Sequence, residues 1–183
     1  MASTVFPVAT AATGVFPTWT QLGFTNPSGL TTLTFSSLGG YKYIKVVGII
    51  FNSQTSATNL RLRINGDSTA GMYINSGVQY AGTNGSVAVR TSGPGTGFDL
   101  GAYGTNLENH IELEFINPTQ TDGKKIVNYN FPGYDGSSYR QNIGTGIYNS
   151  NSAITSISLS STNSYAFEAG NGSITGFYVY GAN

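Results

Sequence analysis

Three residues that could carry chemistry share the segment HIELE, residues 110–114. In a β-strand, His110, Glu112 and Glu114 would lie on one face, with successive Cα atoms about 6.5–7 Å apart. An imidazole and two carboxylates at this spacing are candidate metal ligands, and the two carboxylates are a candidate pair for hydrolysing a polysaccharide. The same alternation is typical of a solvated polar face opposite a buried apolar one. We favour the solvated face, because nothing in the pattern gives the two carboxylates different roles.

Other catalytic machinery is sparse in the sequence. The chain has one histidine and no cysteine, which excludes disulfides, thiolate metal sites and cysteine nucleophiles. No G-x-S-x-G motif marks any of its many serines as a nucleophile. The glycine-rich stretch 93–97 lacks the lysine and Ser/Thr of a phosphate-binding loop. The sequence therefore predicts a protein that is not an enzyme and holds no cofactor or metal.

Aromatic residues are the remaining functional signal, since they make up 13% of the chain and include 12 tyrosines. The segment FPGYDGSSYRQN brings Tyr134, Asp135, Tyr139 and Arg140 into one predicted loop region. Amphipathic rings bind both sugars and protein partners, so these residues, with the predicted loop Gly93–Tyr103, are a candidate contact for a glycan or a protein. Ordinary use of tyrosine on strand surfaces is the alternative.

The charge balance argues against several partners. Eight Lys and Arg residues match eight Asp and Glu residues, and only 9% of the chain is charged, compared with about 25% in typical soluble domains. We therefore expect no binding to nucleic acid. The longest apolar run, residues 44–51, has the length of a strand and contains Lys45, so we expect no membrane insertion. The N-terminus also lacks the basic start and unbroken apolar run of a signal peptide.

The elements that must position these residues are strands. In NLRLRING, three aliphatic residues alternate with two arginines before an Asn-Gly turn, and the segment around HIELEF alternates in the same way. Helical periodicity is nearly absent, and glycine or asparagine recurs at short intervals. About nine short strands separated by turns predict an all-β protein, an antiparallel β-sandwich or jelly roll over residues 29–183. Residues 92–106, with five glycines, are predicted to be a long loop.

The first 28 residues are predicted to form an extended N-terminal arm. They carry no charge, contain three prolines, and place Phe6, Phe16, Trp19 and Phe24 at intervals. Each ring buried on an apolar surface is worth about 1.5–3 kcal/mol. That surface belongs either to the chain's own sandwich or to a neighbouring subunit, and the sequence leaves both open.

Three segments give the chain a resemblance to a known group of proteins. They are LGGYKYIKVVGIIFNSQ, NLRLRINGDSTAGMY and ITSISLSSTNSYAFEAGNGSITGFYVYG, within residues 38–183. Their tyrosine-led strand, L-x-x-R-x-N-G strand and Gly-x-hydrophobic-Tyr-Gly ending resemble the β-rich structural proteins of tailed bacteriophages. Such proteins serve as capsid decoration (cement) proteins or as tips of tail fibres. The resemblance implies no catalytic residues.

The leading hypothesis is a non-enzymatic virion structural protein that decorates the capsid. It would form a homotrimer, bind the major capsid protein or other virion proteins through the arm, and lie on the particle surface after assembly in the host cytoplasm. The alternative is a receptor- or glycan-binding module of a tail fibre, which would contact a host surface glycan. The short arm favours decoration, since fibre proteins generally carry a longer attachment region.

Overall fold

The computed structural model describes residues 18–52, 57–82, 86–104, 108–134, 137–168 and 176–183. These residues form thirteen β-strands and no helix, so none of them belongs to a helix that could cross a membrane. In chain order the strands are β1 (Thr20–Thr25), β2 (Thr32–Phe35), β3 (Tyr43–Asn52), β4 (Thr58–Ile64), β5 (Tyr73–Ala81), β6 (Ser86–Gly95), β7 (Phe98–Tyr103), β8 (Asn109–Ile116), β9 (Lys125–Tyr134), β10 (Tyr139–Tyr148), β11 (Ile157–Ser161), β12 (Phe167–Glu168) and β13 (Gly176–Ala182).

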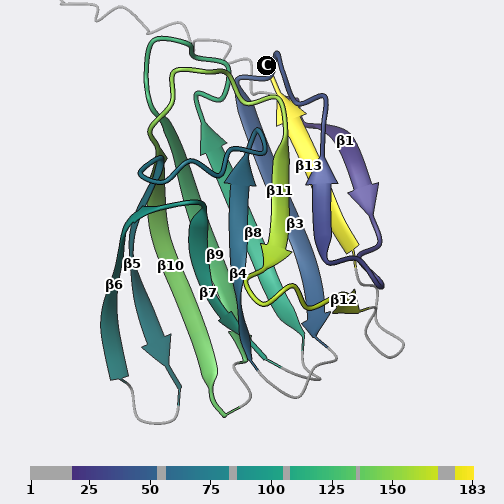
Figure 1. Cartoon of the computed structure of the whole chain (residues 1–183). Helices are drawn as coiled ribbons and strands as arrows, with labels where there is room; N and C mark the ends of the chain where they lie inside the picture. The colour runs from purple at the N-terminus through teal and green to yellow at the C-terminus, as the bar shows by residue number, and fades with distance from the viewer. Residues whose placement is uncertain (1–17, 53–56, 83–85, 105–107, 135–136, 169–175) are drawn as a thin grey trace, which may run out of the picture.

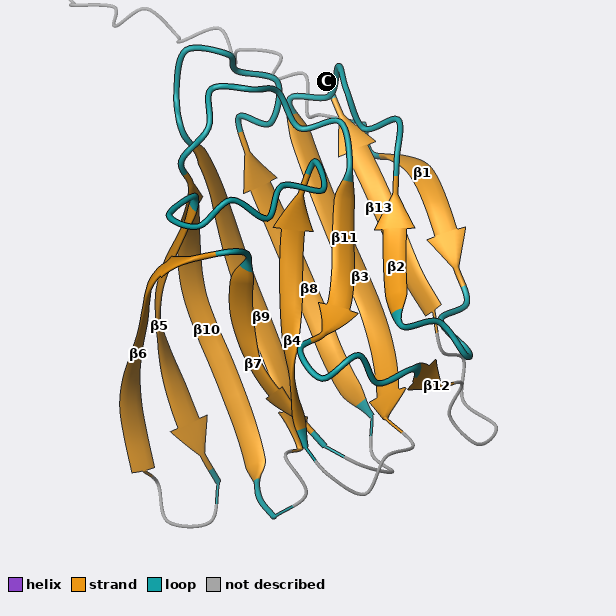
Figure 2. Ribbon diagram, in the orientation of Figure 1, coloured by secondary structure: helices purple, strands orange, loops and turns teal. Residues whose placement is uncertain are grey.

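The strands make two antiparallel sheets packed face to face. The large sheet has the order β1-β13-β3-β8-β9-β10-β5-β6, with β12 paired to β3, and the small sheet has the order β2-β11-β4-β7. In Figure 1 the small sheet lies in front of the large one, and Figure 2 shows that strands make up both layers. This β-sandwich confirms the predicted all-β fold class. We call the face of the large sheet that packs on the small sheet its inner face, and the opposite face its outer face.

Alternating sequence patterns form the two layers. In β4, Leu60, Leu62 and Ile64 are fully buried, whereas the residues between them are only half-buried. Strand β8 alternates between buried and exposed residues as the sequence predicts. Because successive strand residues point to opposite faces, this pattern places the aliphatic side chains in one core between the sheets.

Glycines within strands make room for aromatic rings in this core. A Cβ built on Gly146 would lie 2.5 Å from Phe98 Cε1, and one on Gly48 would lie 2.8 Å from Phe177 Cε1. Such distances are shorter than real side chains tolerate. The rings therefore lie flat over glycine backbone, and this explains how so glycine-rich a chain sustains long strands.

Four sequence predictions are corrected by the structure. The predicted loop at 92–106 contains the end of β6 and all of β7, because its glycines pack under neighbouring side chains. The described residues hold thirteen strands, not about nine. Tyr134 and Tyr139 end β9 and begin β10 as paired residues, so they do not lie within one loop. Residues 20–25 of the predicted arm form β1, which pairs with β13 at the edge of the large sheet.

Candidate functional site

The outer face of the large sheet carries an ordered row of apolar side chains. Tyr43 pairs with Ile116, Ile116 with Ile126, Ile126 with Ile147, and Ile147 with Ile74. This apolar row thus crosses β3, β8, β9, β10 and β5 in a straight line. Ile116 is half-buried and the other four are 37–44% exposed. Sequence analysis missed the row because β5 and β10, which carry two of its members, were not predicted as strands.

A second row, directly beside the first, is polar. Lys45 pairs with Glu114, Glu114 with Asn128, and Asn128 with Thr145. Thr145 Oγ1 donates a hydrogen bond of 3.0 Å to Asn128 Oδ1. Lys45 Nζ lies 2.5 Å from a carboxylate oxygen of Glu112, one row further on. The apolar row is therefore bordered by polar groups, among which Lys45 is paired with Glu112 and Thr145 with Asn128.

A groove crosses the same face further along the strands. It consists of two hollows that share His110 and Pro132. One hollow, of about 450 Å³, lies over β13, β3, β8 and β9 and is lined by Tyr178 and Glu112 among others. The other, of about 960 Å³, extends over β9, β10 and β5. We call the two together the sheet groove.

The larger hollow has an apolar floor and a polar, aromatic rim. Phe51 and Ala81 contribute apolar surface, and Tyr80 and Tyr139 are 46% and 68% exposed. Tyr139 packs edge-on against Tyr134, with ring centroids 5.3 Å apart. Two well-exposed rings therefore stand on neighbouring strands at one end of the groove.

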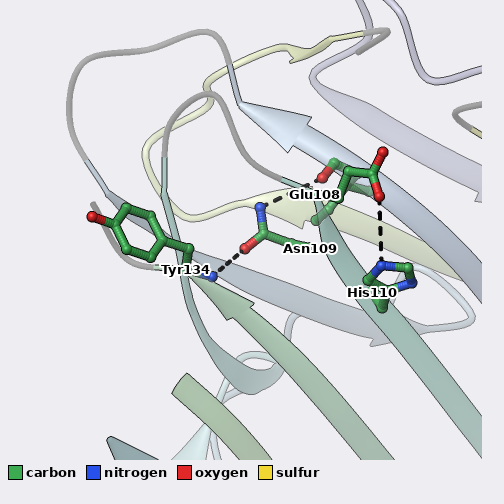
Figure 3. A network of polar contacts seen from close by, with 5 residues as sticks. Glu108, Asn109, His110 and Tyr134 are labelled. Carbon is green, nitrogen blue, oxygen red and sulfur yellow. Dashed lines mark hydrogen bonds and ion pairs between the residues drawn. The ribbon is translucent and has the colours of Figure 1, made fainter. Parts of the chain in front are cut away.

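Backbone pairing between β8 and β9 stops beside His110 and Pro132, the residues that the two hollows share. The ladder ends at Glu112 opposite Asn130, two residues before Pro132, which has no N–H to offer. Beyond this point the side chain of Asn109, fully buried, accepts a 2.8 Å hydrogen bond from the backbone N–H of Tyr134 (Figure 3). Asn109 thus holds the two strands together without a backbone ladder.

His110 and its neighbours lie on the groove side of β8. His110 Nε2 is 3.8 Å from a carboxylate oxygen of Glu108, and Figure 3 shows these side chains pointing away from Asn109. His110, Glu112 and Glu114 share one exposed face, as the sequence predicts. Within the described ranges, no three such ligands come close enough together to hold a metal ion. The side chains of His110, Glu112 and Glu114 are therefore placed to form hydrogen bonds with a bound molecule, not to hold a metal ion.

Known proteins give no direct guide to this surface. No protein-family model matches the chain, and the search of curated proteins finds no match. The assignment of a function therefore depends on the geometry.

The residues of the predicted glycan contact are separated by the sheet. Tyr134 and Tyr139 lie together, but Arg140 Nη1 donates a 3.0 Å hydrogen bond to Gln79 Oε1, a residue buried on the inner face. Residues 98–103 form β7 in the small sheet, on the opposite side from Tyr139. Asp135 lies outside the described residues. Sequence analysis missed Tyr80 and Gln141, which take their places in the groove.

The predicted arm residues are only partly described. Phe6 and Phe16 lie outside the described residues. Trp19 is 41% exposed just before β1. Phe24, in β1, packs against Tyr178 of β13 with ring centroids 4.8 Å apart. Phe24 therefore extends the outer face of the chain's own sheet.

Proposed function

We propose that the protein is a non-enzymatic structural component of a bacteriophage particle, specifically a capsid decoration protein that stabilises the head through contacts between subunits. The observation that carries this proposal is the apolar row. Ile126 and Ile147 are 37% and 41% exposed, so covering the rest of each side chain is worth about 0.6–1.2 kcal/mol, and the five residues of the row together contribute a few kcal/mol to association.

The occupant we assign to the apolar row is another copy of this chain, in a homotrimer. The chain has no formal net charge, so copies approach one another without repulsion. In the polar row beside the apolar one, Lys45 is paired with Glu112 from the row beyond, which leaves the carboxylate of Glu114 as the charge of that row for an interface to accommodate. An apolar centre with a polar rim is the anatomy of stable subunit interfaces.

We further infer that the strands of the sandwich follow the order of a jelly roll. The small sheet follows the order β2-β11-β4-β7, and the large sheet runs β3, then β8-β9-β10, then β5-β6. An eight-stranded jelly roll has two sheets of four strands. The same order is found here if the three strands β8, β9 and β10 are counted in the place of one strand between β3 and β5. Jelly rolls occur in viral capsid proteins and lectins, which supports the proposal without deciding it.

Attachment to the head is assigned to the N-terminal segment ahead of β1. Residues 1–17 carry no charge and include Phe6 and Phe16. They precede Trp19, which is exposed at the edge of the large sheet. A segment of this composition is suited to bind apolar surface on a neighbouring capsid subunit.

Antibody labelling of particles from the phage that carries this gene tests the proposal. We expect electron microscopy to show label distributed over the head. Label confined to the tail tip would contradict the decoration hypothesis and favour the alternative, a receptor-binding module of a tail fibre. Particles free of label, with the protein only in the lysate, would refute a structural role in the virion.

A further inference from the structure

We propose that the sheet groove binds a neutral, linear oligosaccharide. The proposal is independent of the particle location, because the groove and the apolar row are separate surfaces. The nearest groove residues, Glu112 and Asn130, lie four residues along β8 and β9 from Ile116 and Ile126 of the apolar row, about 14 Å at about 3.4 Å per residue, and Tyr139 lies eight residues from Ile147 along β10. A subunit that covers the apolar row can therefore leave the groove accessible.

The groove has the shape of a site for a chain molecule. Its two hollows run from β13 across β3, β8, β9 and β10 to β5. Five strand spacings of about 4.8 Å give a length of about 24 Å. The shared residues His110 and Pro132 make it continuous. An elongated groove of this length accepts several consecutive sugar units and exceeds the needs of a single small metabolite.

Aromatic rings are placed where sugar rings would stack. Tyr178 lies in the smaller hollow, and the exposed Tyr80 and Tyr139 lie in the larger one. A pyranose has an apolar face of C–H groups and an edge of hydroxyls, so it packs on a tyrosine ring while its hydroxyls bond to polar neighbours. Tyr80 and Tyr139 stand on neighbouring strands, and Tyr178 lies four strand spacings from β10, about 19 Å, so the rings can hold the two ends of one short chain.

The polar groups between the rings match vicinal hydroxyls. Gln141 Nε2 donates a hydrogen bond of 3.3 Å to Asn130 Oδ1. Gln141 Oε1 and Asn130 Nδ2 make no hydrogen bond within the described part of the chain. A sugar hydroxyl could therefore donate to Gln141 Oε1, and a neighbouring hydroxyl could accept from Asn130 Nδ2. Glu112, held by Lys45, adds an oriented carboxylate acceptor.

The charges of the groove select a neutral sugar. Glu108 and Glu112 line it, the ammonium of Lys45 is engaged with Glu112, and the guanidinium of Arg140 bonds to Gln79 on the inner face. A carboxylated or sulfated sugar would meet the like charge of Glu108 and Glu112 here, whereas Lys45 and Arg140 are already engaged with Glu112 and Gln79. A protein ligand is disfavoured, since hydrogen-bonding groups interrupt the apolar floor.

A binding titration with the full-length protein tests the inference. The probes are neutral hexasaccharides of glucose, N-acetylglucosamine, mannose and xylose, followed by isothermal titration calorimetry, with a sulfated hexasaccharide as the acidic comparison. We expect one neutral series to bind, and Tyr139→Ala and Gln141→Ala each to weaken that binding at least about tenfold. Tyr139→Phe keeps the ring and should retain binding within about threefold.

The matched control is Tyr165→Ala, which removes a half-buried tyrosine that belongs to neither the groove nor the apolar row. It should leave the affinity unchanged, and thermal melts must show that all variants are folded. Lack of binding to every neutral probe at millimolar concentration would overturn the inference. So would equal weakening by Tyr165→Ala, tighter binding of the sulfated probe, or a peptide that binds through Tyr139 while the sugars do not.

Discussion

The ring of Tyr129 on β9 lies over the backbone of Gly144 on β10, its paired neighbour. A Cβ on Gly144 would stand 2.5 Å from Tyr129 Cζ, and one on Gly77, the next residue across, would stand 2.6 Å from Tyr129 Oη. Tyr129 is nearly fully buried, so its ring has little room to move aside. Gly144 and Gly77, on adjacent strands, thus leave the space that the ring of Tyr129 occupies.

We therefore expect Gly144→Ala to lower the free energy of unfolding by about 1–3 kcal/mol through overpacking. Gly39→Ala is the matched control, because its added Cβ would meet Thr155 at an ordinary 3.8 Å. Urea denaturation of both variants checks the prediction. Equal stability of the two variants would show that Tyr129 can shift freely.

A second prediction concerns the buried Lys125, whose Nζ donates a 2.7 Å hydrogen bond to the carbonyl of Gly123. Burial lowers the pKa of Lys125, because the charged form loses hydration. The unfolded chain then binds the proton more readily than the folded one, so stability rises with pH from the lowered folded pKa up to about 10.5. Lys125→Met should remove this rise and add about 0.5–1 kcal/mol at pH 7.

Stability curves of wild type and Lys125→Met should be compared up to about pH 10.5, where the predicted rise ends. The buried Tyr73 and Tyr103, whose pKa values are raised by desolvation, act with the opposite sign, but they are present in both proteins, so the difference between the two curves isolates Lys125. A variant whose stability still rises with pH as in the wild type would rule out Lys125 as the source.

A third prediction concerns Asp67, in the turn after β4. Its carboxylate accepts hydrogen bonds from the backbone N–H of Thr69 at 2.8 Å and from Tyr148 Oη at 2.9 Å. The bonds from Thr69, chiefly the backbone one, lower the pKa of Asp67 below 3.8. This contribution to stability is present above about pH 3.8 and is lost as pH falls through the lowered value.

Asp67→Asn should therefore cost about 1 kcal/mol at pH 7 and make the acid limb of the stability curve shallower. Asp122→Asn, an exposed carboxylate elsewhere in a turn, is the control. Thermal melts from pH 2 to pH 7 provide the measurement. Parallel acid limbs for wild type and Asp67→Asn would contradict the assignment.

A fourth prediction separates the N-terminal segment from the sandwich. Deletion of residues 2–17 should leave the melting temperature within about 2 °C of wild type but abolish cosedimentation with heads of the same phage. Deletion of residues 2–25 should also destabilise the fold, because it removes β1 and uncovers Tyr178 and Gly176. Head binding at wild-type occupancy after the shorter deletion would remove the segment from the mechanism.

The sequence indicates the architecture better than the site. Alternation in β4 and β8 identifies buried faces directly, since it depends only on local period. The sequence does not predict β5 and β10, because glycines such as Gly77 and Gly144 usually interrupt strands. In the fold both glycines lie against the ring of Tyr129 from β9. The apolar row and the groove depend on the register of these strands, which the local pattern does not contain.

The central claim is association through the apolar row, and sedimentation velocity tests it most directly. The test variant is Ile126→Lys with Ile147→Lys, which places two charges on paired residues of the row. The control is Thr34→Lys with Ser158→Lys, on paired residues of the small sheet. We predict a species three times the 19.2 kDa chain mass for wild type and control, unchanged in 1 M NaCl, and a monomer for the test variant. A monomeric wild type at micromolar concentration, or a test variant that remains trimeric, would contradict the account.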